Sequence, residues 1–398
     1  MRIDIVGTGL GPGSITREGQ QVIDDAGLLV GSSRLIEAVG GDGQTAVVAS
    51  RPDEVIAAIE ASRASRVAVL MSGDVGFHSG ATKVADWVRA SRPDIELRLV
   101  PGVSAVAGLA ALAGVPWQDA CLVSCHGSDT DLVSPVRRHR RTIALTGGNV
   151  AGLATSLADA GYGELDVWAG QDLGQPGESL THTTIERLPG KPWSALTTLL
   201  IENPGFDDRT PAGLPDERFA RGTVPMTKSA VRAIVAARLA TRPADTCYDI
   251  GCGTGSVTVE LALAAYAGRV FGVDKNPEAV GLTRQNCRAF HVGNVTAEQG
   301  SAPEALECWP APDVAFIGGS SGAMREIVGA IARRNRQVRI AITAIAIESA
   351  AAAIDALAAA GFDPRVVQIG VAEGRATGGL HLMVAQNPVT LIYGGCDD

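Results

Sequence analysis

Short apolar runs alternate with segments of helical periodicity along this 398-residue sequence, and glycine-rich loops directly follow several of the runs. Such alternation is typical of α/β layers, in which helices cover a largely parallel sheet. The expected strands include 2–6, 67–71 and 97–100 in the first half of the chain, and 246–250 and 269–274 in the second. Because open α/β sheets bind ligands beside the carboxyl ends of their strands, the glycine loops are candidate ligand sites.

The alternation breaks between residues 205 and 225, where prolines, glycines and the pair Asp207-Asp208 replace regular periodicity. A stretch of this composition typically connects two domains. We therefore expect an N-terminal α/β module at 1–205, a linker at 206–222, and a second α/β module, doubly wound, at 223–398. The run 380–386 is expected to be the last strand of that second module.

Charge and cysteine usage narrow the class of protein. The net charge of −9 argues against a general nucleic-acid binder, because a phosphate backbone requires a basic surface. No uncharged apolar run reaches the roughly 18 residues of a membrane span, and the chain starts with a strand pattern rather than a signal peptide. The seven cysteines are scattered and contain no Cys-x-x-Cys pair. We expect free thiols, no metal, and a cytoplasmic protein that binds neither nucleic acid nor membrane.

The clearest local motif is Asp249-Ile250-Gly251-Cys252-Gly253-Thr254-Gly255, between an expected strand and an expected helix. Glycines let the backbone approach a ligand, and unpaired N–H groups at the start of a helix can hold it. Asp274 ends the next strand, where a carboxylate can pair with both hydroxyls of a ribose. A dinucleotide and S-adenosylmethionine both fit this arrangement, and a purely structural glycine turn is the third alternative.

Two features favour S-adenosylmethionine. The spacing is G-x-G-x-G rather than the G-x-G-x-x-G of dinucleotide sites. An acid just before the glycines would repel a pyrophosphate, whereas it can face the cationic sulfonium and ammonium groups of the methyl donor. We therefore expect the donor to contact Asp249, Gly251, Cys252, Gly253, Thr254, Gly255 and Asp274.

The motif resembles that of class I methyltransferases. The resemblance implies that Gln299-Gly300-Ser301-Ala302 lies beside the adenine, with Ser301 and Ala302 in contact, although many relatives carry an acid in place of Ser301. After the expected strand 313–318, the chain has no Asn-Pro-Pro-aromatic motif to hold an exocyclic amine. A carbon nucleophile therefore fits better than a base or amide nitrogen.

The N-terminal module has three glycine loops of its own, 6–13, 71–78 and 101–105. The first is no dinucleotide fingerprint, because Pro12 breaks the strand-to-helix hinge and no acid ends the next strand. Taken alone, it could be only a tight turn. All three loops nevertheless leave the carboxyl ends of strands, where open sheets place their ligand crevice. Ser104, in the third loop, is expected to cap the helix that follows it.

This trio of loops, in this order, resembles the tetrapyrrole methylase family, whose methyl donor lies in a cleft between two α/β lobes. The resemblance implies that the donor contacts Gly9, Gly11, Pro12, Gly73, Asp74, His78, Ser104 and Ala105. Val75 stands where the family's Gly-Asp-Pro motif has proline. The segments Ser124-Cys125-His126-Gly127 and Leu145-Thr146-Gly147-Gly148 should face the donor or the substrate from the second lobe.

Two methyl-donor folds in one chain resemble the fused precorrin methyltransferases of cobalamin synthesis. Further matches are Pro225-Met226-Thr227-Lys228, Gly318-Gly319-Ser320-Ser321-Gly322, and Gly374-Arg375 with Asn387-Pro388-Val389. The resemblance implies one S-adenosylmethionine site per module, with Thr227 against the donor. It also implies a homo-oligomer that methylates a tetrapyrrole at C5 and C15 and releases carbon dioxide from the C12 acetate.

Methyl transfer from a sulfonium requires alignment and a dry cleft, but neither a metal nor a covalent nucleophile. A nearby group must then move a proton, and the candidates are His78, His126, Lys228 and His381. His126 could equally be a satisfied histidine at a strand end. The carboxylates of an anionic tetrapyrrole call for basic partners, for which Lys228, Arg232 and Arg375 are candidates by motif position.

Three other functions remain open from the sequence. An NAD-linked oxidoreductase on the C-terminal fold would not bind S-adenosylmethionine. An RNA methyltransferase conflicts with the acidic charge and the missing base-holding motif. A sensor that binds the donor without catalysis would methylate no tetrapyrrole.

Overall fold

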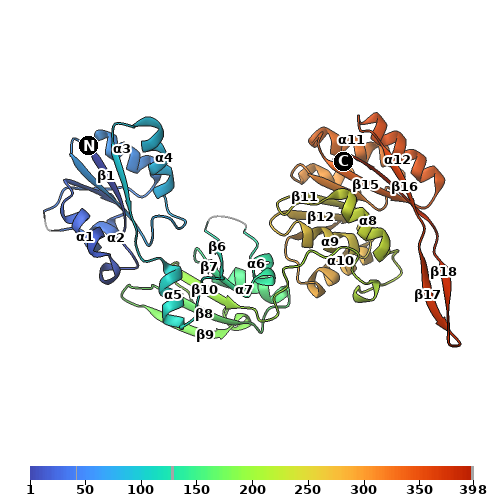
Figure 1. Cartoon of the computed structure of the whole chain (residues 1–398), viewed down its shortest axis with the longest axis horizontal. Coiled ribbons are helices and arrows are strands. Elements are labelled where there is room, and N and C mark those ends of the chain that lie inside the picture. Colours follow the sequence, from blue (N-terminus) through green and yellow to red (C-terminus); the bar gives the residue numbers. More distant parts are fainter. Residues whose placement is uncertain (42, 127–129, 396–398) are drawn as a thin grey trace. The chain divides into compact units, whose positions relative to one another are not determined.

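A computed structural model describes residues 1–41, 43–126 and 130–395, and it confirms the predicted α/β class. The chain forms two compact units (Figure 1). The first comprises Met1–Thr130, His139–Thr155 and Gly163–Gly205, and the second Asp131–Arg138, Ser156–Tyr162 and Phe206–Asp398. In the described part of the chain, no helix is long and apolar enough to cross a membrane.

The first unit begins with a five-stranded parallel sheet in the order β3-β2-β4-β1-β5. Its strands are β1 (Arg2–Gly7), β2 (Leu28–Gly31), β3 (Ala46–Val48), β4 (Arg66–Met71) and β5 (Glu96–Val100). Its helices are α1 (Arg17–Asp24), α2 (Ser33–Val39), α3 (Pro52–Ala61) and α4 (Ala81–Ser91). The central strands are buried on both faces, which explains why their sequences are continuous apolar runs.

A second five-stranded sheet of this unit has the order β6-β7-β10-β8-β9 and is antiparallel except for the pair β6 and β7. Its strands are β6 (Cys121–Ser124), β7 (Arg141–Leu145), β8 (Asp166–Gln171), β9 (Ser179–Thr184) and β10 (Thr197–Glu202). The helices α5 (Ala105–Ala113) and most of α7 (Val150–Asp159) belong to the same unit, whereas α6 (Val133–Arg138) and the end of α7 belong to the second unit. The polar edge strand β9, Ser-Leu-Thr-His-Thr-Thr, has no apolar run that sequence inspection could detect.

The second unit contains a seven-stranded sheet in the order β13-β12-β11-β14-β15-β19-β16. Its strands are β11 (Thr246–Ile250), β12 (Arg269–Asp274), β13 (Val295–Gln299), β14 (Val314–Ile317), β15 (Arg339–Ala344), β16 (Arg365–Ile369) and β19 (Val389–Gly394). Strand β19 runs antiparallel to both its neighbours, β15 and β16, and the other neighbouring pairs of this sheet are parallel. The helices are α8 (Ser229–Leu239), α9 (Ser256–Ala264), α10 (Pro277–Ala289), α11 (Met324–Arg334) and α12 (Ile347–Ala359).

The expected last strand, 380–386, does not join this sheet. It forms β18 (Leu380–Ala385), which pairs with β17 (Ala372–Thr377) in a two-stranded hairpin that extends from the unit (Figure 1). Every residue of both hairpin strands is exposed. The buried strand that completes the sheet is β19, which sequence inspection missed.

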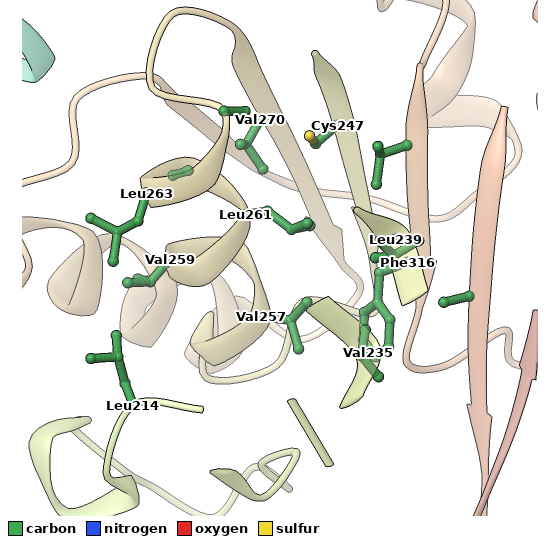
Figure 2. Packing of buried hydrophobic residues seen from close by; sticks show 14 of the residues in the cluster. Leu214, Val235, Leu239, Cys247, Val257, Val259, Leu261, Leu263, Val270 and Phe316 are labelled. Carbon is green, nitrogen blue, oxygen red and sulfur yellow. The ribbon is translucent and has the colours of Figure 1, made fainter. Parts of the chain in front are cut away.

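The core of the second unit lies on both faces of its sheet. Alternation along β11 sends Cys247 to one cluster, which includes α8 and α9, and Tyr248 and Ile250 to the other, which includes α11 and α12. The segment expected to be a linker, 206–222, contributes Leu214 and Phe219 to the first of these clusters. Figure 2 shows Leu214 in this cluster together with residues of α9. This segment is therefore packed into the second unit.

Candidate functional site

A cavity of about 900 Å³ opens at the carboxyl ends of β11, β12, β14 and β15 in the second unit. Among the predicted donor residues, its lining includes Thr227, Gly251, Cys252, Gly253, Thr254, Asp274, Ser301 and Ala302. The lining also contains Lys228 and groups that sequence inspection left out, among them Lys275, Ser349 and Ile345. Lys275 and Ile345 directly follow β12 and β15, so the rule that ligands lie at carboxyl ends could have found them, whereas Ser349 lies in the first turn of α12.

The glycine loop after β11 is shaped by close backbone contacts. Gly251, Gly253 and Gly255 all have positive φ, between 57° and 75°, a region that other residues rarely adopt. A Cβ on Gly251 would lie 2.8 Å from the amide nitrogen of Gly319, and one on Gly255 would lie 2.7 Å from the Cα of Thr283. The lack of a side chain at Gly251 thus lets the loop after β14 approach the glycine loop, and the lack of one at Gly255 lets α10 pack against it.

Asp274 lies at the edge of the cavity with both carboxylate oxygens anchored. Oδ2 accepts a hydrogen bond from the Gly253 amide at 3.0 Å, and Oδ1 accepts one from the Asn276 amide at 2.9 Å. Each oxygen can still accept a further hydrogen bond. A carboxylate fixed in this way is suited to a pair of vicinal hydroxyl groups, which is the role predicted for it.

Asp249 is fully buried beneath the glycine loop and does not line the cavity. The Thr258 hydroxyl donates to its Oδ2 at 2.5 Å, while Oδ1 has no hydrogen-bond partner within the described residues. Burial raises the pKa of this carboxyl group from 3.8 to about 7. The expectation that Asp249 contacts the donor directly is corrected, because its carboxyl group lies buried below the loop and outside the cavity lining.

The segment 223–228, which we call the strap, forms one side of the cavity. At its start, the amide and hydroxyl of Thr223 donate to the carboxylate of Glu278, at 3.0 and 2.8 Å. Near its middle, the carbonyl oxygen of Pro225 would lie 3.1 Å from a Cβ on Gly253. At its end, the ammonium of Lys228 lies 3.5 Å from Asp216. The strap therefore closely faces the glycine loop and is held at both ends.

Three predicted substrate or catalytic residues lie elsewhere. Arg232 is 1% exposed, and its guanidinium donates to Glu260, Asp216 and two backbone carbonyls, so it has no accessible face for a substrate carboxylate. This corrects the expected substrate contact. Arg375 and His381 are exposed on the hairpin and do not line the cavity, so within one chain the structure does not bring them to Lys228.

In the first unit, the three predicted loops meet at the carboxyl ends of β1, β4 and β5. Gly9 and Gly73 exchange two backbone hydrogen bonds, of 3.1 and 2.9 Å. The carboxylate of Asp74 accepts from the amide of Gly76 at 2.8 Å and from that of Gly102 at 3.1 Å. A Cβ on Gly102 would lie only 2.3 Å from the carbonyl oxygen of Gly73. Bare backbone is therefore required where these loops cross.

The remaining predicted residues of this unit lie around that crossing or on the second lobe. Ser104 caps α5 as predicted, since its hydroxyl accepts from the Ala107 amide at 3.2 Å, and Ala105 is the first residue of the helix. Gly11 precedes a turn that begins at Pro12, and a Cβ on it would meet the carbonyl oxygen of Gly174. Hence this loop touches the connection after β8.

Both histidines proposed for the first unit are exposed. His78 has a positive φ of 45°, and its ring meets the Phe77 ring edge-on, with the two ring centroids 4.7 Å apart. His126 follows β6, with its Nδ1 3.5 Å from the Ser124 hydroxyl, and its Cα would lie 3.2 Å from a Cβ on Gly147. The predicted segments 124–127 and 145–148 thus lie side by side, except that Gly127 is outside the described residues.

Comparison with known proteins places both halves of the chain. Residues 2–189 match the family model "Tetrapyrrole (Corrin/Porphyrin) Methylases", and residues 217–393 match "Precorrin methyltransferase domain". A precorrin-6Y C(5,15)-methyltransferase (decarboxylating) from Sinorhizobium is 30% identical over 86% of this chain and 84% of its own length.

Two further relatives each match slightly less than half of the chain. A probable cobalt-precorrin-6B C(15)-methyltransferase (decarboxylating) from Methanothermobacter thermautotrophicus is 39% identical over 46% of this chain and 96% of its own length. The solved structure of a precorrin-6Y C5,15-methyltransferase from Geobacter metallireducens is 33% identical, with a TM-score of 0.44, and covers 46% of this chain and 95% of that one.

Proposed function

The chain belongs to the family of the precorrin-6Y C(5,15)-methyltransferases, and from that membership we propose that each of its modules methylates one carbon of the same tetrapyrrole. It is an S-adenosylmethionine-dependent methyltransferase. The proposed reaction converts precorrin-6Y to precorrin-8, with methylation at C5 by residues 1–205, methylation at C15 by residues 223–398, and loss of carbon dioxide from the C12 acetate.

The observation that carries the proposal is the pair of glycine-loop sites at the carboxyl ends of parallel strands, one in each unit. In the second unit, the cavity combines open glycine backbone with the anchored carboxylate of Asp274. Bare backbone and the anchored carboxylate of Asp274 fit the ribose and the cationic groups of S-adenosylmethionine. In the first unit, Gly73 supplies open backbone, because a Cβ there would meet no atom nearer than the Cα of Ser104 at 3.9 Å, while Gly9 and Gly102 let the loops cross beside it.

When bound, S-adenosylmethionine supplies a methyl group that is already activated for in-line transfer. The protein's part is to align the two reactants and to exclude water. Asp274 would orient the donor through its ribose, and the strap would cover it, with Thr227 in the cavity lining. Lys228, at the end of the strap, would hold a carboxylate of the substrate through its ammonium.

The proton must leave the methylated carbon through a group within reach of it. In the second unit, Lys228 is the predicted candidate that lines the cavity; it would accept the proton only as a neutral amine, a role that excludes holding a carboxylate as an ammonium, whereas His381 lies on the exposed hairpin. In the first unit, His78 and His126 are both exposed near the loops that we propose bind the donor, and both remain candidates. Arg375 is retained as a substrate contact only if the hairpin reaches the cavity of another copy.

We further propose that the chain forms a homo-oligomer through the hairpin β17–β18. Strand β18 exposes Leu380, Leu382, Met383 and Val384, each by 48% to 69% of its surface. Contiguous exposed apolar side chains of this kind mark interaction surfaces. The proposed location is the cytoplasm, in keeping with the thiols of Cys121, Cys247, Cys252, Cys287 and Cys308, none of which forms a disulfide within the described residues.

The decisive experiment is incubation of the protein with precorrin-6Y and S-adenosylmethionine, followed by mass spectrometry of the product. The proposal predicts a gain of two methyl groups and loss of one carbon dioxide. A donor that carries a labelled methyl group should place two labels in the product. A tetrapyrrole that leaves the reaction unchanged, while the protein binds the donor, would contradict the proposal.

A further inference from the structure

A buried cluster of three charged side chains lies behind the strap, between α8, α9 and the segment 213–216. At its centre is Arg232, whose Nε donates to Glu260 at 2.7 Å and whose Nη1 donates to Asp216 at 2.9 Å. Nη1 also donates to the carbonyl of Thr227, and Nη2 to that of Leu214. The guanidinium is therefore bonded on three of its nitrogens while fully removed from water.

The two carboxylates extend this network into the backbone. Glu260 accepts from the amides of Gly213 and Leu214, both at 2.9 Å. Asp216 accepts from the amide of Ser229 at 3.0 Å. The cluster thus binds the segment that enters the second unit on one side, and the first turn of α8 on the other.

The bonds to Thr227 and Ser229 flank Lys228, at the end of the strap. At its other end the strap is held by Glu278, which is exposed and forms hydrogen bonds at a solvated surface. Hydrogen bonds to charged groups in a buried setting contribute more than exposed ones. By this argument the Arg232 cluster is the stronger of the two anchors.

We propose that Arg232, together with Asp216 and Glu260, is a positioning device that sets the strap against the donor cavity of the second unit. The inference rests on the proposed function in one respect, namely that this cavity binds S-adenosylmethionine. It assigns no contact between Arg232 and either reactant. Its effect is transmitted through the Thr227 carbonyl and the Ser229 amide to a wall of the cavity.

Burial of an ion pair is by itself weak evidence for a stabilising role, because an apolar replacement of similar volume is often equally stable. The same unit contains a second buried arginine that serves as a matched control. Arg339 is 7% exposed, and it donates to Asp245 and to the carbonyls of Leu239 and Ala240 at the end of α8. It lies at the start of β15 and does not line the cavity.

The test compares Arg232→Lys with Arg339→Lys in the full-length protein. Lysine keeps the charge but cannot span two carboxylates and two carbonyls at once. Both variants should lower Tm. Only Arg232→Lys should weaken donor binding at the second site, by about tenfold or more, as expected for loss of hydrogen bonds to a charged group. Calorimetry would measure donor affinity, and the first-unit site serves as an internal reference.

Steady-state kinetics distinguish the positioning role from a purely structural one, because a purely structural role would leave the KM for donor unchanged. The KM for donor in C15 methylation should rise in Arg232→Lys, while C5 methylation keeps its KM. If Arg232→Lys does not fold, Asp216→Asn and Glu278→Ala test the two anchors separately, and the buried Asp216 should have the larger effect on donor affinity. Equal effects of the Arg232 and Arg339 variants, or of the two anchors, would overturn the inference.

The two proposals fail in distinguishable ways. If the wild-type protein binds no donor at the second site, the proposed function is wrong. If the wild-type protein binds donor there and Arg232→Lys binds it equally well, only the positioning role is wrong.

Discussion

Replacement of Gly102 by alanine should disable the first module and leave the second one active. Gly102 is the second residue of the loop after β5, at the point where the three loops of the first unit cross. The new Cβ would lie 2.3 Å from the carbonyl oxygen of Gly73 and 2.6 Å from that of Gly7. Both neighbours are backbone atoms at strand ends, so neither can rotate away as a side chain would.

The size of the effect follows from this geometry. To restore even a 3.0 Å contact with Gly73, the loops must separate by about 0.7 Å. Overpacking of a tight site costs about 1–3 kcal/mol. In a unit of this size that corresponds to a loss of roughly 2–12 °C in Tm. A displacement approaching 1 Å at a site that aligns two reactants can reduce the rate by up to about 100-fold.

The assay is calorimetric titration with S-adenosylmethionine, combined with mass spectrometry of the tetrapyrrole product. The wild-type protein should bind two donors per chain, and Gly102→Ala should bind one with unchanged affinity. The rate of C5 methylation should fall by about 10- to 100-fold. Gly13→Ala is the matched control, because a Cβ there meets no atom within 4 Å. Two intact donor sites and an unchanged Tm in Gly102→Ala would refute the reasoning.

Three further predictions concern the second unit. Burial raises the pKa of Asp249 to about 7, so between about pH 4 and 7 the folded state keeps a proton that the unfolded state has released. The stability of the wild-type protein relative to Asp249→Asn should therefore fall as the pH rises through this window. Parallel profiles of Tm against pH for the two proteins would contradict this prediction. Leu382→Ser, on the exposed hairpin, should lower the mass of the assembly measured by light scattering, with little change in Tm. An unchanged mass would show that the hairpin is not part of the interface. Burial raises the pKa of the Cys247 and Cys252 thiols, so peptide mass spectrometry after brief alkylation should find exposed Cys308 modified well before either of them.

The parts of the fold that sequence inspection predicted have local causes. The strand β11 and the glycine loop after it could be predicted because an apolar run and three positive-φ glycines are neighbours in the chain. The cap at Ser104 is equally local, since donor and acceptor are three residues apart. The edge strand β9 was missed because its polar residues face solvent and leave no apolar pattern.

The hairpin shows where pattern alone misled. Residues 380–386 are apolar enough to indicate a sheet strand, yet β18 is exposed along its whole length, and the buried strand is β19. An apolar run shows that burial is favourable, but not whether burial occurs within the chain or against a partner. Only the pairing of β19 with β15 and β16 decides which run completes the sheet.

The sequence by itself determined the α/β layering, the two glycine-loop systems and the acid at the end of β12, because chain periodicity and steric freedom depend on near neighbours. The tertiary structure alone decided what the charged groups do. Arg232 was expected to face a substrate, but partners 16 and 28 residues away bury it and use its donors. Asp249 was expected to touch the donor, but the loop above it closes it off. The electrostatic environment of a side chain is set by segments that fold onto it from a distance, and local sequence does not encode that packing.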